Sequence, residues 1–361
     1  MVRVCLVAGA RPNFMKIAPI ARALESHGIT PAIVHTGQHY DERMSQAFFR
    51  ELEIPPPIAN LEAGFGSAVA QTAQIMQRLE PVLLEYRPNW VVVVGDVNST
   101  VAAAFTTSKL GLRLAHVEAG LRSFDRTMPE ELNRIVTDAV SDRLFASEPS
   151  GVANLKREGV DERRIFLVGN VMIDTLLANL ERARSARTWE RFDLPIREFA
   201  VATLHRPSNV DVRENLISIL RAIEYAAQKL PVLLPVHPRT RKRIDEFGLA
   251  ALLAESGARV VEPLGYVDTI SLIDAARLVL TDSGGVQEET TALCVPCITL
   301  RENTERPITL EVGSSRLVGS RFEAIVAAVD AVLAGPARIG AVPELWDGKA
   351  AERIASNLLA E

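Results

Sequence analysis

The chain is poor in cysteine and has no long apolar segment. Its 361 residues include 3 cysteines, which are too few for a disulfide framework. Cys294 and Cys297 have the spacing of metal ligands, but no second Cys/His pair accompanies them, so we interpret them as the apolar start of a strand. No segment reaches the ~18 apolar residues of a membrane span, and the N-terminal run, Met1 to Gly9, is too short for a signal peptide. We expect a cytoplasmic protein with no membrane partner and no bound metal.

Basic residues are slightly outnumbered by acidic residues. The chain has 40 Lys and Arg residues against 45 Asp and Glu residues, a net charge of −5, so a nucleic acid is not an expected partner. Such a protein can still bind a small anion through a local basic site. The sequence also lacks a Gly-x-Gly-x-x-Gly fingerprint, a Walker sequence and a nucleophile elbow. We therefore expect no nicotinamide cofactor.

Short apolar runs alternate with longer amphipathic stretches, which predicts an α/β protein with parallel sheets covered by helices. The alternation restarts near residue 199, and the length suits two domains. We predict an N-terminal domain over residues 1–169 and a second domain over 170–348, with a helix over 349–361 that packs back on the first. In the first half we expect strands at 2–8, 32–36, 90–95, 112–117, 143–146 and 164–168. Helices are expected between them at 13–27, 41–51, 67–86, 99–110, 129–141 and 150–158.

In the second half we expect a helix at about 171–184 and strands at 199–204, 232–236, 260–263, 278–281, 297–300 and 316–318. The strand at 278–281 turns through Ser283-Gly284-Gly285 into a helix that contains Glu289. Glycines let backbone amides approach a ligand, and a helix N-terminus favours an anion. This turn is therefore a candidate phosphate cradle, with Glu289 as a candidate acceptor for a ribose diol. An ordinary strand-to-helix turn would show the same residues.

Charged residues gather at the exits of the predicted strands, where ligands bind in open α/β sheets. Arg11 and Lys16 follow the first strand, and we expect both to take an external anion because a helix N-terminus does not favour cations. Asp96 follows the strand at 90–95, Glu118 follows the strand at 112–117, and Glu130 lies at the start of the helix at 129–141. Asp96 could instead cap its helix, and the helix dipole alone could explain the acids near Glu130.

Two strand exits in the second half each carry a histidine and an arginine. His205-Arg206 follows the strand at 199–204, and His237-Pro238-Arg239 follows the strand at 232–236. A single histidine is most often structural. Two adjacent strands that both end in a histidine and an arginine favour a functional site at this edge of the sheet.

Four motifs together resemble the non-hydrolysing UDP-N-acetylglucosamine 2-epimerases. They are His116-Val117-Glu118-Ala119-Gly120-Leu121-Arg122, Pro129-Glu130-Glu131-x-Asn133-Arg134, Thr281-Asp282-Ser283-Gly284-Gly285-x-Gln287-Glu288-Glu289 and Asn303-Thr304-Glu305-Arg306-Pro307. The Gly9 to Lys16 stretch and Gly95-Asp96 also match, so the similarity runs in order over nearly the whole chain.

This resemblance implies an isomerase with two Rossmann-like doubly wound domains that face a cleft (GT-B-like). It implies that UDP-GlcNAc and UDP-ManNAc are interconverted without metal or nicotinamide, and we expect a homodimer. By matching position, the acid/base residues are Asp96, Glu118, Glu130 and His205. The implied substrate-binding residues are Arg11, Lys16, Arg134, Arg206, His237, Ser283, Gly284, Gly285, Glu289 and Arg306.

The sequence departs from this pattern in two places. Tyr40-Asp41-Glu42-Arg43 follows Gln38-His39, unlike bacterial members that need UDP-GlcNAc as an allosteric activator, and His205-Arg206-Pro207-Ser208-Asn209 replaces their His-Arg-Arg-Glu. The stretch Thr36 to Asp41 is also similar to relatives acting on UDP-2,3-diacetamido-glucuronate, so the C3 and C6 groups of the sugar stay open. A GT-B glycosyltransferase, a hydrolysing relative or a non-catalytic nucleotide-sugar sensor would also use a nucleotide-binding turn of this kind.

Overall fold

The computed structural model describes residues 2–37, 52–64 and 66–360, and the chain divides into two compact units. Unit 1 comprises Met1–Thr175 with Glu344–Glu361, and unit 2 comprises Leu176–Pro343. We predicted domain limits after residues 169 and 348. These limits differ from the limits of the two units, and they stay predictions. None of the described helices combines the length and apolar character needed to cross a bilayer.

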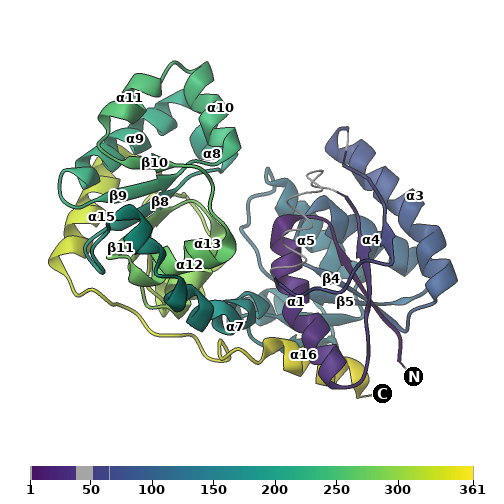
Figure 1. Cartoon of the computed structure of the whole chain (residues 1–361). Coiled ribbons are helices and arrows are strands. Elements are labelled where there is room, and N and C mark those ends of the chain that lie inside the picture. The colour runs from purple at the N-terminus through teal and green to yellow at the C-terminus, as the bar shows by residue number, and fades with distance from the viewer. Residues whose placement is uncertain (1, 38–51, 65, 361) are drawn as a thin grey trace. The chain divides into compact units, whose positions relative to one another are not determined.

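Unit 1 is built on a parallel sheet that includes β4 and β5 (Figure 1), and its described strands have the order β3-β2-β1-β4-β5-β6-β7. Its strands are β1 (Val4–Ala8), β2 (Ala32–His35), β3 (Ala59–Asn60), β4 (Trp90–Val94), β5 (Arg113–Val117), β6 (Arg143–Ala146) and β7 (Ile165–Leu167). Its helices are α1 (Arg11–Ser26), α3 (Ala68–Tyr86), α4 (Asn98–Lys109), α5 (Pro129–Val140), α6 (Pro149–Arg157), the start of α7 (Val171–Ala186) and α16 (Ala350–Leu359), with a 3₁₀ turn at Glu162–Arg164.

The central strand β4 explains why this sheet is covered on both faces. All five of its residues are apolar and buried, the pattern of a parallel strand between two helical layers. The chain leaves β1 toward β2 on one side and later runs from β4 to β5 on the other. Because parallel crossovers are right-handed, α1 and α4 lie on opposite faces. The reversal between β1 and β4 is a topological switch point, where ligands bind beyond the strand ends.

Unit 2 repeats this plan with the strand order β10-β9-β8-β11-β12-β13 among its described residues. Its strands are β8 (Ala200–Thr203), β9 (Val232–Pro235), β10 (Arg259–Val261), β11 (Leu278–Thr281), β12 (Cys297–Thr299) and β13 (Ser315–Leu317). Besides the rest of α7 and a 3₁₀ turn at Thr188–Phe192, its helices are α8 (Pro207–Val210), α9 (Arg213–Ala227), α10 (Pro238–Glu246), α11 (Ala250–Glu255), α12 (Tyr266–Ala275), α13 (Gly284–Ala292), α14 (Ile308–Glu311) and α15 (Phe322–Ala334).

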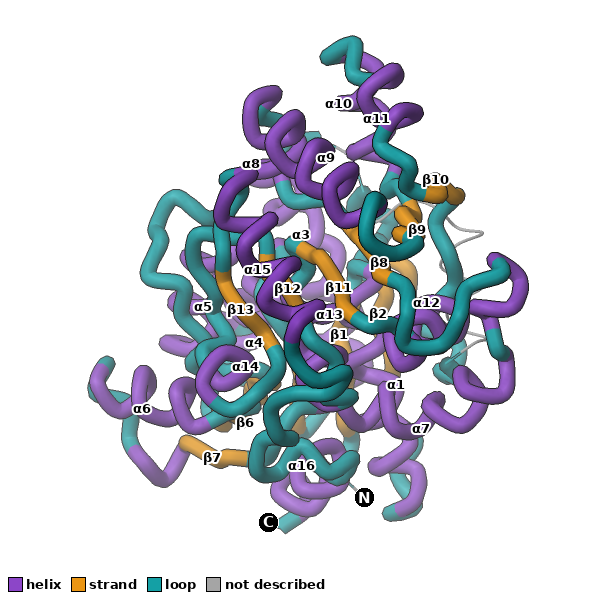
Figure 2. The backbone as a smooth tube through the Cα atoms, turned by 90° about the vertical axis from the view of Figure 1, so that its left-hand side faces the viewer, coloured by secondary structure: helices purple, strands orange, loops and turns teal. Residues whose placement is uncertain are grey.

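Helices α9 and α15 of unit 2 lie side by side (Figure 2), and the apolar core of this unit lies between them and its sheet. Leu216, Ile219, Leu220 and Ile223 of α9 are buried there at helical spacing, so one face of α9 covers the sheet. The switch point of this sheet lies between β8 and β11. The exits of these two strands are therefore where a ligand of unit 2 is expected.

The predicted α/β class and the two doubly wound, GT-B-like units are confirmed. The predicted strands are also confirmed, with ends that differ by at most two residues. The expected helix at 41–51 lies outside the described residues. Strand β3 was not predicted, because a two-residue edge strand has no periodicity to detect.

Candidate active site

Glu118 follows β5 and is held in a left-handed backbone conformation, with φ of 70°. Its carboxylate forms an ion pair with the ammonium of Lys16 from α1, and both side chains are buried. A Cβ on Gly95, at the exit of β4, would lie 2.9 Å from Lys16 Nζ and 3.2 Å from Glu118 Oε2. Gly95 thus leaves room for this pair at the switch point. Lys16 thus has a partner within the protein, and its contact with an external anion stays a prediction.

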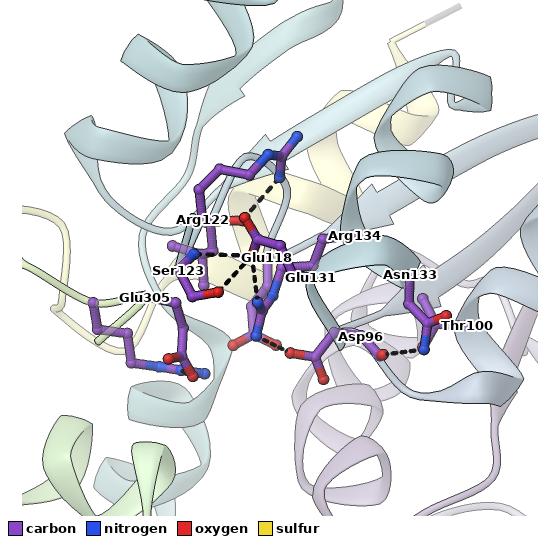
Figure 3. Close-up of polar contacts among 12 residues, drawn as sticks. Asp96, Thr100, Glu118, Arg122, Ser123, Glu131, Asn133, Arg134 and Glu305 are labelled. Carbon is purple, nitrogen blue, oxygen red and sulfur yellow. Dashed lines mark hydrogen bonds and ion pairs between the residues drawn. The ribbon is translucent and has the colours of Figure 1, made fainter. Parts of the chain in front are cut away.

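Asp96 is joined to Arg134 of α5, whose other terminal nitrogen lies 3.1 Å from Glu131 Oε2 (Figure 3). The backbone carbonyl of Asp96 accepts a hydrogen bond of 2.8 Å from Asn133. Val97, not Asp96, occupies the N-cap position of α4. Arg134, predicted to bind substrate, is buried and orients Asp96.

Two adjacent acids at the start of α5 differ in what they contact. Glu131 is 1% exposed and accepts hydrogen bonds from the backbone of Ser123 at 2.8 Å and of Phe124 at 3.0 Å. It fixes the loop between β5 and α5. Glu130 is partly exposed, and within the described part of the chain its carboxylate has no hydrogen bond or ion pair. The carboxylate of Glu130 can therefore contact a ligand, and its predicted acid/base role stays a prediction.

The switch point of unit 2 is organised by Asp282, a fully buried carboxylate directly after β11. It accepts hydrogen bonds from the backbone N–H groups of His205 (3.1 Å) and Arg206 (3.0 Å) and from the Asn209 amide (3.1 Å). His205 Nδ1 lies 3.2 Å from Asp282 Oδ1. A carboxylate only accepts, so of the two neutral forms of the ring it favours the one with hydrogen on Nδ1, which leaves Nε2 to accept a proton.

The surroundings of His205 favour its neutral form. Burial lowers the pKa of His205; Asp282 opposes this shift, whereas Arg206, Arg301 and Arg239 add to it. The side chain is still 39% exposed, so it is packed on one side and open to a ligand on the other. The ring of His237 lies 5.8 Å away, between centroids, and its Nδ1 caps α10 by accepting from the N–H of Arg239.

The candidate phosphate cradle is the N-terminus of α13, where Ser283 is the N-cap and its hydroxyl accepts from the N–H of Val286. A Cβ on Gly284 would lie 2.8 Å from Arg306 Nη1, so glycine lets this guanidinium approach the helix start. The first amides of a helix and an adjacent arginine together favour an anion. Glu289, one turn further along α13, is 4% exposed.

Three arginines and two glutamates form a cluster of charges beside the cradle. Arg306 forms ion pairs with Glu288 and Glu305, and Glu305 also lies 2.7 Å from Arg301 Nη2 and 3.7 Å from Arg206 Nη2. Three guanidinium groups thus share two carboxylates. Arg301 is buried, and its Nη1 finds no hydrogen-bond partner among the residues that the structure describes. An anion bound here could accept a hydrogen bond from Arg301 Nη1.

The structure thus divides the predicted site residues into two sets, one on each unit. In unit 1 it brings together Lys16, Asp96, Glu118 and Arg134, with Glu130 nearby on α5; the side chain of Arg11 lies outside the described residues. In unit 2 it brings together His205 and His237, and separately Arg206 and Arg306 beside the Ser283 cap. The described residues contain no group of three or more side chains suited to a metal ion.

Three residues of the site, Asp282, Arg301 and Glu305, had no role assigned from the sequence. Asp282 and Glu305 stood inside quoted motifs, and Arg301 follows the strand next to the cradle. The position of Arg301 at a strand exit was therefore the signal that could have found it.

The chain resembles known proteins over most of its length. A family model described as UDP-N-acetylglucosamine 2-epimerase matches residues 22–359. The protein of that name from Methanocaldococcus jannaschii is 44% identical over 338 residues, which cover 92% of each chain. The UDP-2,3-diacetamido-2,3-dideoxy-D-glucuronate 2-epimerase of Pseudomonas aeruginosa is 41% identical over 329 residues, 90% of each chain.

Solved structures of UDP-GlcNAc 2-epimerases are also similar to this chain. The crystal structure of Methanocaldococcus jannaschii UDP-GlcNAc 2-epimerase in complex with UDP-GlcNAc and UDP superimposes with a TM-score of 0.92 at 43% identity. The UDP-GlcNAc 2-epimerase from Neisseria meningitidis bound to UDP-GlcNAc gives a TM-score of 0.91 at 28% identity. Both comparisons cover 100% of each chain.

Proposed function

Because the chain belongs to the UDP-N-acetylglucosamine 2-epimerase family and is an epimerase, we propose that it interconverts UDP-GlcNAc and UDP-ManNAc by elimination and re-addition of UDP. A glycosyltransferase, which the sequence alone left open, does not belong to this family. The proposal adds the sugar substrate, the route and the residue roles to the family assignment.

The chemistry explains why such a site needs both an anion cradle and several acid/base groups. The hydrogen on C2 is not acidic, because C2 carries an amide nitrogen and is not adjacent to a carbonyl group. If UDP leaves C1 while the proton leaves C2, the product is the neutral glycal 2-acetamidoglucal. Cations and N–H donors aimed at the departing diphosphate stabilise its developing charge. Epimerisation then requires a proton to return on the opposite face of C2, which requires a second acid/base group.

The cradle of unit 2 suits the diphosphate. The start of α13 at Gly284 offers N–H groups, and Arg306 lies against that glycine. Arg301 and Arg206 place two further guanidinium groups beside it, both close to Glu305. Glu289 lies one turn further along α13 and is proposed to accept hydrogen bonds from the ribose diol. Arg11, Lys16 and His237 are proposed as further substrate contacts.

Four residues are proposed for the proton transfers, and they differ in whether a cation or a carboxylate lies beside them. Glu118 and Asp96 are each paired with a buried cation, Lys16 and Arg134 respectively. Glu130 has no such partner in the part of the chain that the structure describes. His205 is oriented by Asp282 and favoured as the neutral ring. Neutral imidazole and an unpaired carboxylate are the forms that can accept a proton near neutral pH.

The observation that carries the proposal is the presence in one chain of a positively charged cradle and a separate set of carboxylates at strand exits. The test is an NMR time course of the protein with UDP-GlcNAc. Formation of UDP-ManNAc up to a constant ratio of the two epimers is expected. Release of UDP with free ManNAc would indicate a hydrolysing enzyme, and an unchanged spectrum would contradict the proposal.

A second candidate substrate is UDP-2,3-diacetamido-2,3-dideoxy-D-glucuronate, because a 2-epimerase of that sugar is 41% identical to this chain. The reaction at C1 and C2 is the same, so only contacts to the C3 and C6 groups distinguish the two. Parallel time courses with both substrates at equal concentration measure the ratio of kcat/KM. A higher kcat/KM for the diacetamido sugar would replace UDP-GlcNAc as the principal substrate.

The remaining parts of the proposal concern assembly and location. A homodimer is supported by exposed apolar side chains on the contacting helices α3 and α4, namely Val69, Leu84 and Phe105. Sedimentation equilibrium would give the mass of one chain if this is incorrect. A cytoplasmic location is supported by the three cysteines, all of which are free thiols.

A further inference from the structure

A buried histidine and a buried aspartate lie directly behind the acids of unit 1. His116 is the fourth residue of β5 and is fully buried. Its Nδ1 lies 2.7 Å from Asp138 Oδ1 on α5, and its Nε2 lies 2.9 Å from the backbone carbonyl oxygen of Gly95. A carboxylate and a carbonyl can only accept, so the ring donates from both nitrogens as an imidazolium.

The second oxygen of Asp138 is also occupied. Oδ2 accepts a hydrogen bond of 3.1 Å from the N–H of Gly120 and lies 2.7 Å from Arg122 Nη2. Burial by itself would raise the pKa of Asp138, but the charges of His116 and Arg122 outweigh it and hold the pKa below its usual range. Asp138 is thus an ionised acceptor whose partners all come from β5 and the segment that follows it.

The backbone groups that His116 and Asp138 contact lie next to Asp96 and Glu118, two of the residues proposed for proton transfer. Gly95, whose carbonyl oxygen accepts from His116, immediately precedes Asp96. Gly120, whose N–H donates to Asp138, follows Glu118 by two residues. The His116–Asp138 pair therefore links the exit of β4 to the exit of β5.

The backbone at Glu118 needs such support. Glu118 and Gly120 both have positive φ, 70° and 79°, and the left-handed region is unfavourable for a residue with a side chain. Residues in that region persist where neighbouring contacts fix them, and they concentrate at functional sites. Two residues after Glu118, the backbone of Gly120 is fixed by Asp138, which accepts from its N–H, and by Asn154, whose amide donates to its carbonyl at 2.9 Å.

We propose that His116 and Asp138 are positioning residues for epimerisation, which hold Asp96 and Glu118 in the geometry required for proton transfer at C2. The inference rests on the proposed function. A buried ion pair is weak grounds for stability, because the cost of removing two charges from water offsets their attraction. A displacement of about 1 Å at a reacting group can slow a reaction roughly 10²-fold, so precise placement is a sufficient reason for the pair.

The test is Asp138→Asn, an isosteric change that removes the charge and leaves an amide facing donors. Its control is Thr137→Val, also isosteric and on the adjacent residue of α5. Thr137 is fully buried, and its hydroxyl has no partner among the described residues, so this change breaks no described contact. For Asp138→Asn we expect kcat to fall by roughly 10- to 100-fold. Its KM for UDP-GlcNAc and its Kd for UDP should stay within about twofold of the values for the unaltered protein. For Thr137→Val, kcat, KM and Kd should all stay within about twofold of those values.

The outcomes separate this inference from the proposed function. If the unaltered protein does not epimerise UDP-GlcNAc or the diacetamido sugar, the proposed function fails first. If it does, and folded Asp138→Asn retains the kcat of Thr137→Val, the positioning role is overturned. His116→Gln, which can keep a donor toward Gly95 but not the bond to Asp138, is the second variant and should also lose kcat at unchanged KM. If both network variants fail to fold while Thr137→Val folds, the pair is a folding requirement and the inference is wrong.

Discussion

The change Asp282→Asn tests whether Asp282 orients His205 and sets which ring nitrogen carries the hydrogen. Asp282 is fully buried, accepts from the backbone of His205 and Arg206, and orients the His205 ring through Nδ1. Asparagine has the same shape, but it keeps one acceptor oxygen and replaces the other with an amino group. If the oxygen stays with the backbone donors, the amino group faces His205 Nδ1. The ring can then accept from the asparagine only by moving its hydrogen to Nε2.

The expected effects follow from this exchange of tautomers. With hydrogen on Nε2 the neutral ring can no longer accept a proton there, and a general base contributes ~10²–10⁴ to a rate. We therefore expect kcat to fall at least ~10²-fold. If the ring does not adjust, one buried donor loses its acceptor, at a cost of about 1–3 kcal/mol in the free energy of unfolding. The Kd for UDP should change little, because Ser283, Gly284 and Arg306 form the cradle.

The assay combines kinetics with a titration of His205 by NMR. The negative charge of Asp282 favours the imidazolium, so its removal should lower the pKa of His205 further below 6.5. Asp330→Asn is the matched control, because Asp330 accepts from Tyr225 at 2.8 Å on the surface of the same unit. It should leave kcat unchanged. A folded Asp282→Asn protein with kcat within twofold of that of the control would refute the role assigned to Asp282 and His205.

Three further changes test separate parts of the site and the fold. Glu289→Ala should weaken UDP binding roughly tenfold or more, since a hydrogen bond to a charged group contributes about 1.5–3 kcal/mol; an unchanged Kd by calorimetry would exclude the ribose contact. Glu130→Gln should slow epimerisation ~10²–10⁴-fold and release 2-acetamidoglucal with UDP, detectable by NMR, at nearly normal UDP affinity. Asp174→Ala should lower the free energy of unfolding by about 0.5–2 kcal/mol, because Asp174 accepts from the N–H groups of Ala350 and Ala351 at the start of α16. Denaturant unfolding with an unchanged midpoint would contradict that cap.

The fold could be predicted from the sequence because its signals are local. The apolar run Trp90–Val94 and the restart of the pattern at Phe199 mark buried strands whatever their neighbours are. Edge strand β3 could not be predicted, since Ala59–Asn60 pairs with β2 through backbone bonds and carries no pattern of its own. The order of the strands in each sheet was not predicted either, because it depends on pairings between distant segments.

The candidate site was predictable to the extent that its residues stand at strand exits. Asp96, Glu118 and His205 were found in this way. What the sequence could not reveal was how the charges are paired. Lys16 and Arg134 were predicted to bind ligand, whereas the structure pairs them with Glu118 and Asp96, across 102 and 38 residues of sequence respectively. Such contacts arise from tertiary packing and leave no local signal.

Elimination and re-addition require that C2 loses its hydrogen as UDP departs and regains one from protein groups. The most direct measurement of this step is the NMR spectrum of the epimer formed in D₂O. Because carboxylate and imidazole protons exchange with solvent, the UDP-ManNAc formed from UDP-GlcNAc should carry deuterium at C2. Epimer that wholly retains its original C2 hydrogen would contradict elimination and re-addition, and with it the roles proposed for Glu130 and His205.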